Sequence, residues 1–397
     1  MKQFPRALRS SVLGGLRPMP IRSCRVKATM AADTVRMPGF PMADTVRMES
    51  LAHTPTAREE GPDFDFSRHV NLSALDLDGI RVRKLSELGY KVSPGEIDFG
   101  YSEPFRLLSE EGLRLYREAI LSKPVLENCY YSCPMVPLTI RNMAAHNKFI
   151  RQMSTSEAML LACSSMVGCD LAWHPFRVEH MMTNIQMKGK EATKVFDWHH
   201  DSNSFVLLVN LSEIPEDGRR GGTLMQDAAG NAHEVRAPGP GWAYIMQGKR
   251  VLHAADASEN WTRIVSVISF CSKATLAAES VEEDTVDLHL ARNYTDHALL
   301  DKEYAAYRLS RSMDKLSFLR DRFLDEEAND FSSLARRKDL VRHLEHLIRN
   351  LQITSSSLQM LTDWEQPRPR PLPVDEVPVT EIASAFNLCK HRQLHGC

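Results

Sequence analysis

The 397-residue sequence has no long apolar run and no strong excess of charge of either sign. No stretch reaches the roughly 18 uninterrupted apolar residues of a transmembrane helix, which argues against a membrane span. The formal net charge is only −2, so no electrostatic bias indicates nucleic acid or a membrane surface as a partner. We therefore expect a globular protein with neither of these partners. The sequence does not indicate an oligomeric state.

Cysteine is present, but not in the spacing of a metal or disulfide framework. The eight cysteines are scattered, and none of them form a CxxC pair. Cys129 and Cys133 have the closest ligand-like spacing, but no second pair completes a zinc set. Free thiols are typical of a reducing compartment, so we expect a cytoplasmic protein.

Residues 1–62 do not have the pattern of a folded core. Seven basic residues precede the first acid, Asp33, with serines and prolines between them, as in a mitochondrial transit peptide. Three early prolines limit an amphipathic helix, and a hexapeptide at 32–37 recurs at 43–48. This repeat is too short for a repeat array. A disordered tail or a misassigned start is the simpler interpretation, and mitochondrial import is the alternative to the cytoplasm.

Residues 63–170 are predicted to be mainly helical. The segment 109–121 begins with a capping serine and early acids, and its apolar residues recur at helical spacing. Two further helices are expected at 142–153 and 156–166, and Gly168 supplies a stop signal for the second.

Residues 171–275 are predicted to be a β core, because short apolar runs alternate there with turn residues. Strands are expected at 176–187, 205–211 and 242–247, and a hairpin is expected from 224 to 236 around a Gly-Asn turn. Turn signals at this frequency indicate a sandwich or barrel. The fold class is therefore α+β.

Residues 276–360 are predicted to be helical again, at 301–324 and 333–351, with amphipathic stripes that indicate packing faces. His343 and His346 are three apart, and a solvated helix face is favoured over a metal site. Residues 361–397 contain a proline-rich run, which indicates an exposed tail or linker in the polyproline II conformation.

The candidate chemistry is concentrated in the run 197–201, Asp-Trp-His-His-Asp. His199 and Asp201 are two residues apart, so both point to the same side of an extended strand, while His200 points away. His253 lies on a later predicted strand. Two imidazoles and one carboxylate on a single face are the ligand set of non-haem iron(II) sites.

Arg263 follows His253 by ten residues, and a Gly-Gly pair at 221–222 opens another strand. Together these features resemble the iron(II) and 2-oxoglutarate dependent oxygenases, over roughly residues 171–275. The resemblance implies a double-stranded β-helix, or jelly roll, with the metal in its open mouth. It also implies that the N-terminal and C-terminal helices pack around this core.

The resemblance further implies that His199, Asp201 and His253 hold Fe(2+), and that Arg263 grips the far carboxylate of 2-oxoglutarate. The planar guanidinium suits this task because it gives two parallel charge-assisted bonds. Dioxygen would then be used to oxidise an unactivated C–H bond of a small molecule, by hydroxylation, desaturation or cyclisation, with release of succinate and CO2. Halogenation is disfavoured because the carboxylate of Asp201 is present.

Weaker candidates surround this set. Asn184 and Gln186 share one face of an early strand and are candidate contacts of the cosubstrate, and Tyr244 is a candidate partner of Arg263. The RxS pattern of some relatives is missing, because Val265 stands where that serine would be. Ser266 has an odd offset from Arg263 and is expected on the opposite face.

The run around Gly221-Gly222 and residues 246–248 more loosely resembles fungal oxygenases of secondary-metabolite biosynthesis. Three alternatives to the main hypothesis stay open. One is an iron-dependent oxidase that does not use 2-oxoglutarate, the second is a cupin-like enzyme with another metal, and the third is a non-catalytic binding protein on the same barrel.

Overall fold

The computed structural model describes most of the chain after residue 60. The described residues are 61–71, 77, 79–93, 96–132, 138–174, 180–189, 194–201, 203–272, 297–324, 334–362 and 370–388. All of them belong to one compact unit, residues 51–397. The predictions for residues 1–60 therefore lie outside the described part of the chain.

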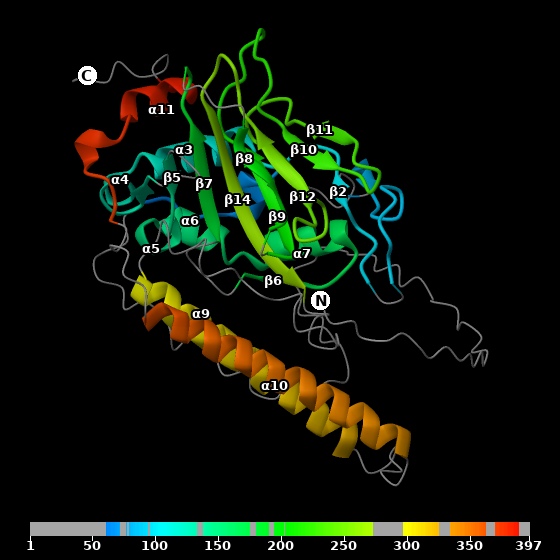
Figure 1. The fold of residues 1–397 in the computed structure, drawn as a ribbon. Coiled ribbons are helices and arrows are strands. Elements are labelled where there is room, and N and C mark those ends of the chain that lie inside the picture. The colour runs from blue at the N-terminus through cyan, green and yellow to red at the C-terminus, as the bar shows by residue number, and fades with distance from the viewer. Residues whose placement is uncertain are drawn as a thin grey trace, which may run out of the picture. The chain divides into compact units, whose positions relative to one another are not determined.

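Two antiparallel sheets form the centre of this unit (Figure 1). The larger has the strand order β1-β2-β12-β9-β14-β7-β5-β4, with β3 beside β12 and β6 beside β14. Its strands are β1 (Val82–Arg83), β2 (Tyr101–Ser102), β3 (Phe105–Arg106), β4 (Tyr130–Tyr131), β5 (Leu138–Ile140), β6 (Leu171–Trp173), β7 (Met181–Gln186), β9 (Phe205–Asn210), β12 (Trp242–Met246) and β14 (Arg263–Ser272).

The smaller sheet has the order β11-β10-β13-β8. Its strands are β8 (Lys194–His199), β10 (Thr223–Gln226), β11 (Ala232–Val235) and β13 (His253–Asp256). The predicted hairpin is confirmed, because β10 and β11 pair in register from Thr223–Val235 to Gln226–Ala232. The predicted α+β class is confirmed at the level of mixed helices and antiparallel sheets.

Strand β14 separates two hydrophobic cores, because it is buried on both faces. Ile264 and Ile268 pack on the helical side, while Val265 and Val267 point to the other side. We call this second cluster the inter-sheet core, since its members come from both sheets. Its buried residues are Leu85, Tyr101, Val206, Leu208, Met225, Val235, Tyr244, Met246, Val251, Val265 and Val267. The strict alternation of β14 thus assigns each residue to one core.

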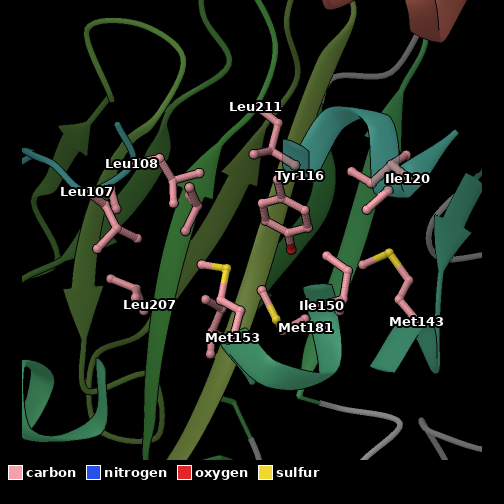
Figure 2. Close-up of a cluster of buried hydrophobic side chains, with 14 of the residues drawn as sticks. Leu107, Leu108, Tyr116, Ile120, Met143, Ile150, Met153, Met181, Leu207 and Leu211 are labelled. Carbon is pink, nitrogen blue, oxygen red and sulfur yellow. The ribbon is translucent and has the colours of Figure 1, made fainter. Parts of the chain in front are cut away.

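Helices cover the other face of the larger sheet, and their side chains form the first core together with β7 and β9 (Figure 2). They are α3 (Glu110–Ile120), α4 (Lys123–Asn128), α5 (Met143–His146), α6 (Lys148–Met153) and α7 (Glu157–Val167). Tyr116 is fully buried here, and its hydroxyl contacts Ser266 on β14. The expectation that Ser266 faces away from Arg263 is therefore confirmed.

The helix boundaries follow the capping residues. Ser109 accepts a hydrogen bond from the Gly112 N–H at 3.0 Å, and Gly168 ends α7 in the left-handed conformation with φ 77°. The single helix predicted at 142–153 is wrong. Asn147 is extended, with φ −143°, and caps a new helix by accepting from the Ile150 N–H.

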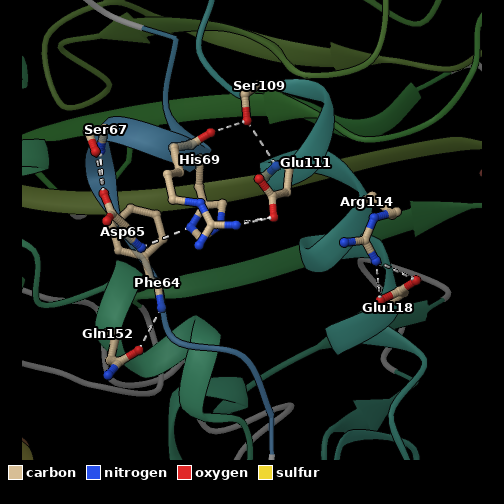
Figure 3. Close-up of polar contacts among 11 residues, drawn as sticks. Phe64, Asp65, Ser67, His69, Ser109, Glu111, Arg114, Glu118 and Gln152 are labelled. Atoms are coloured by element: carbon tan, nitrogen blue, oxygen red, sulfur yellow. Dashed lines mark hydrogen bonds and ion pairs between the residues drawn. The ribbon is translucent and has the colours of Figure 1, made fainter.

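The short helix α1 (Phe66–His69) is fastened to the start of α3 (Figure 3). The Ser109 hydroxyl donates to the Arg68 carbonyl at 2.7 Å, and the Asp65 N–H donates to Nδ1 of His69 at 2.9 Å. His69 is buried, and burial lowers its pKa. These contacts fix the first described residues against the helical layer.

The C-terminal segment departs from the prediction of an exposed tail. A 3-10 turn, η5 (Val374–Glu376), leads into α11 (Val379–Ala385), and both Ile382 and Phe386 are buried in the first core. Arg117 of α3 binds this segment: its Nη1 donates to the Phe386 carbonyl at 2.9 Å, and its Nε donates to the Leu211 carbonyl at 2.7 Å.

Two long helices, α9 (His297–Leu324) and α10 (Leu334–Thr362), form an antiparallel hairpin (Figure 1). Both extend beyond their predicted bounds. The solvated face predicted for His343 is wrong, because His343 is 1% exposed and lies in the contact between the helices. Among the described residues, no helix is both long enough and apolar enough to cross a membrane.

We expect Arg117→Ala to destabilise the fold by about 2–4 kcal/mol, because it leaves buried carbonyls without donors. Urea unfolding followed by circular dichroism measures this change. Arg114→Ala on the same helix is the matched control. Arg114 forms a surface ion pair with Glu118, so its loss should cost about 0.5 kcal/mol or less. Equal effects of the two substitutions would contradict the role given to Arg117.

Candidate metal centre

The two sequence-predicted histidines face each other across a strand pair. In the pairing of β8 with β13, His199 lies directly opposite His253, and Met225 of β10 lies opposite His253 on its other side. Directly opposed residues of antiparallel strands share a face. Since Met225 belongs to the inter-sheet core, both imidazoles also point between the sheets. Their ring centroids are 4.2 Å apart.

Asp201 completes the cluster just beyond the end of β8. Its Oδ1 lies 3.4 Å from Nε2 of His199 and 3.5 Å from Nε2 of His253. One ligand atom from each residue lies within 4.8 Å of the others, and this is the one such group in the described residues. His200 is exposed and lies outside the group, as the alternation predicted.

Each imidazole is oriented by a backbone carbonyl. Nδ1 of His199 lies 2.7 Å from the carbonyl oxygen of Asp197, and Nδ1 of His253 lies 2.9 Å from that of Val251. Because a carbonyl only accepts, both Nδ1 atoms carry the proton. Both Nε2 atoms are directed at the same carboxylate oxygen, an arrangement that needs a proton or a metal ion between them. Such a hydrogen bond from Nδ1 to a backbone carbonyl is typical of metal-ligating histidines.

The charges of the cluster stabilise one another. Burial by itself would raise the pKa of Asp201, but His253 and the hydrogen bonds from both histidines lower it well below its usual range. Burial likewise opposes the charged form of His253, yet Asp201 raises its pKa overall. A cation bound by all three groups would also stabilise the Asp201 carboxylate, so this set of donor atoms fits a divalent metal.

Gly248 holds the carboxylate in place. Its carbonyl accepts a hydrogen bond from the Asp201 N–H at 3.0 Å. A Cβ added to Gly248 would also overlap the Oδ2 atom of Asp201. The carboxylate therefore occupies the space that any other side chain would need, and its Oδ1 is turned toward the histidines. The sequence indicated only a turn at this glycine, and no local signal marks its contact with Asp201.

Arg263 lies in a small recess that is lined by Tyr244, Asn210, Trp261 and others. It is 3% exposed, and its Nε donates to the Gly221 carbonyl at 2.7 Å. No carboxylate of the described residues lies within ion-pair distance of it. The charge of Asp256 acts to raise the pKa of Arg263, but Asp256 itself accepts a hydrogen bond from Nε of Arg220 at 3.0 Å. Burial lowers the pKa of Arg263, so a bound anion would stabilise this cation.

The recess and the histidine cluster are neighbours along β10. Thr223 is two residues from Met225 and shares its face, about 7 Å further along the strand. Its hydroxyl lies 2.6 Å from the hydroxyl of Tyr244, which lines the recess. The sequence did not single out Thr223. A ligand that reaches from the cluster toward Arg263 therefore has only a short distance to span.

The weaker candidates have structural partners. Gln186 accepts from the Ser258 N–H at 2.8 Å and fastens the loop between β13 and β14. The Oδ1 of Asn184 accepts from the Thr139 hydroxyl at 3.0 Å. Asn184 is directly opposite Val265, so it does face the space between the sheets.

No family model and no curated protein matches this sequence. Solved structures resemble it weakly. The non-haem alpha-ketoglutarate dependent epimerase SnoN from nogalamycin biosynthesis has 13% identity, covers 44% of this chain and 78% of its own, and has a TM-score of 0.35. The carbocyclase SnoK of the same biosynthesis has 12% identity, with 48% and 86% covered and a TM-score of 0.33.

A prolyl-4-hydroxylase from Pseudomonas putida has 13% identity, covers 44% of this chain and 93% of its own, and also has a TM-score of 0.33. Similarity at this level carries no functional conclusion. The chemistry of the site is therefore inferred from this chain's own residues.

We expect Gly248→Ala to weaken divalent metal binding about 10- to 100-fold. Changes to residues that position a metal ligand usually have effects of this size. Gly248 does not adopt the left-handed conformation, so its backbone tolerates alanine and only the carboxylate must move. Anaerobic calorimetric titration with Co(II) measures the affinity. Gly239→Ala is the control, because its added Cβ meets only one atom, at 4.0 Å. Unchanged affinity in Gly248→Ala would contradict the role of the contact.

Proposed function

We propose that this protein is an Fe(II)- and 2-oxoglutarate-dependent oxygenase built on a double-stranded β-helix. One observation carries the proposal. His199 and His253 present Nε2 to the same oxygen of Asp201, next to a recess that contains the buried cation of Arg263. The residues fit both a facial metal site and an anchor for a dicarboxylate.

In this proposal His199, Asp201 and His253 hold the iron through Nε2, Oδ1 and Nε2. The carbonyls of Asp197 and Val251 keep the two imidazoles in the correct tautomer and orientation. Gly248 keeps the second carboxylate oxygen turned away from the histidines. A set of three protein ligands would leave further coordination positions for a cosubstrate and a substrate.

Arg263 suits the distal carboxylate of 2-oxoglutarate because it is buried and its Nε is already fixed by Gly221. The guanidinium edge is therefore oriented before the ligand arrives, which lowers the entropic cost of binding. The Tyr244 hydroxyl, held by Thr223, is positioned to donate to the same carboxylate. Asn184 faces the same space and is proposed as a contact of the cosubstrate.

When bound, iron, 2-oxoglutarate and dioxygen supply an oxidant that takes hydrogen from an unactivated C–H bond, with release of succinate and CO2. The apolar inter-sheet core, including Leu208, Met225 and Val265, excludes water from this region. We propose a small molecule as substrate and hydroxylation, desaturation or cyclisation as the outcome. A place in fungal secondary metabolism and a cytoplasmic, or alternatively mitochondrial, location belong to the same proposal.

We expect a weak visible charge-transfer band when the protein is titrated anaerobically with Fe(II) and then with 2-oxoglutarate. The band should require both additions and should disappear in His253→Ala, which removes a ligand. His200→Ala is the matched control, since His200 is adjacent in sequence but lies outside the cluster. Iron binding without a band would instead favour the oxidase or the binding-protein alternative.

A second test separates the anchor from the metal site. Arg263→Gln should raise the 2-oxoglutarate concentration needed for the band about 100-fold, because charge-assisted hydrogen bonds of about 1.5–3 kcal/mol each are lost. Fe(II) affinity should stay unchanged. Arg236→Gln is the control: Arg236 lines the same recess, but its Nη2 donates to the Gly218 carbonyl at 2.9 Å. Equal losses in both variants would argue for a general charge effect.

A further inference from the structure

A short segment that begins at Arg220 contacts both the carboxylate of Asp256 and the guanidinium of Arg263. Nε of Arg220 donates to Oδ2 of Asp256 at 3.0 Å, and its Nη2 donates to Oδ1 of the same carboxylate. The next carbonyl, that of Gly221, accepts from Nε of Arg263 at 2.7 Å. The carbonyl of Gly222 then accepts from the Asp256 N–H at 3.0 Å. Three consecutive residues therefore bind the acid and the cation separately.

The backbone of this segment has a conformation that arginine rarely adopts. Arg220 has φ 58° and Gly221 has φ 90°, so two successive residues are left-handed. The other non-glycine residues with positive φ in the described part of the chain are Asn142 and Asn387, and asparagine adopts this conformation more readily. Such strain persists where surrounding contacts fix it. Here the contacts are the Asp256 ion pair and a β-bridge between Arg220 and Ser258.

Asp256 and Arg263 are both buried, with exposures of 5% and 3%. A buried carboxylate and a buried cation ordinarily pair, because either charge is costly without a partner. The charge of Asp256 acts to raise the pKa of Arg263, so the two groups are close enough to attract each other. Both oxygens of Asp256 instead bind the fork of Arg220, whose side chain is 40% exposed. This two-bond geometry is the strongest that an arginine and a carboxylate form.

We propose that Arg220 is a positioning residue, which holds Asp256 away from Arg263 and so keeps Arg263 available for the distal carboxylate of 2-oxoglutarate. This inference rests on the proposed function. A carboxylate of the chain itself on Arg263 would compete with the cosubstrate. The apparent affinity for a ligand falls in proportion to the fraction of protein whose site is open. Arg220 keeps that fraction high.

The competing interpretation is an ion pair that only stabilises the fold. The two interpretations differ in what removal of both partners does. If Asp256 competes for Arg263 once Arg220 is lost, a second substitution that neutralises Asp256 removes the competitor and restores cosubstrate binding. If the pair is merely structural, the second substitution leaves the binding defect in place. Glu234 and Glu259 also act on the charge of Arg220, but both are exposed, so water screens them.

Anaerobic titration of the Fe(II)-loaded protein with 2-oxoglutarate tests this role. Arg220→Gln should raise the 2-oxoglutarate concentration needed for the charge-transfer band about 10-fold, because Asp256 then occupies Arg263. Fe(II) affinity should stay unchanged. Arg220→Gln/Asp256→Asn should return within about twofold of the wild type, because the pair it removes is neutral overall. Arg219→Gln is the matched control, since it removes the same charge from the neighbouring, exposed position.

An unchanged titration in Arg220→Gln overturns the proposal, and so does a double variant that binds no better than the single one. Circular dichroism checks that each variant is folded. If Arg220→Gln is unfolded, Arg220→Lys takes its place, because lysine keeps the charge but not the planar fork that binds both oxygens. A smaller loss is then expected, with the same recovery in Arg220→Lys/Asp256→Asn, and absence of that recovery is equally decisive.

Failure of the proposed function is recognised separately, because the wild type would then bind iron without the band. In that case the same variants are compared for binding of succinate, a dicarboxylate, to the Co(II)-loaded protein by calorimetry. Weaker binding in Arg220→Gln and recovery in the double variant uphold the role of Arg220 at an anion site of another kind. Equal affinities, or no succinate binding in any of the proteins, overturn it.

Discussion

The candidate site depends on one strand pairing, that of β8 with β13. This register places His199 opposite His253 and thereby brings together two residues that are far apart in the sequence. A slip of one residue would turn either imidazole to the other face of the small sheet, and the cluster would be lost. The pairing also sets the position of Asp201, whose backbone N–H is bound by Gly248 in the turn that precedes β13.

Buried charge is the second constraint on the molecule. The Asp201 carboxylate is stabilised by its contacts with the two histidines, and Asp256 is paired with Arg220. Arg263 differs from these groups, because its described partner is a neutral carbonyl. Burying a cation in this way is costly unless an anion binds. The strand that carries Arg263 also contributes Ser266 to the contact with Tyr116, so the helical layer and the site share one rigid element.

The hairpin of α9 and α10 differs from the two sheets in how its polar and apolar side chains are distributed. Its buried residues include Arg308 and Asn350 beside the apolar Leu319, Phe323 and Leu347, while eight other large apolar residues of the two helices are exposed. A polar inner seam supplies less hydrophobic stabilisation than an apolar one.

The sequence by itself determined the local features. The alternation of side chains along a strand predicted that His199 and Asp201 face away from His200, and that Arg263 faces away from Ser266. Capping residues located α3 and α7. Both signals depend only on neighbours within a few residues. Tertiary structure decided the rest. The recess at Arg263, the contact of Gly248 with Asp201, the burial of His343 and the docking of α11 all join distant segments. No local pattern encodes such contacts, because they exist only after the sheets and helices have packed.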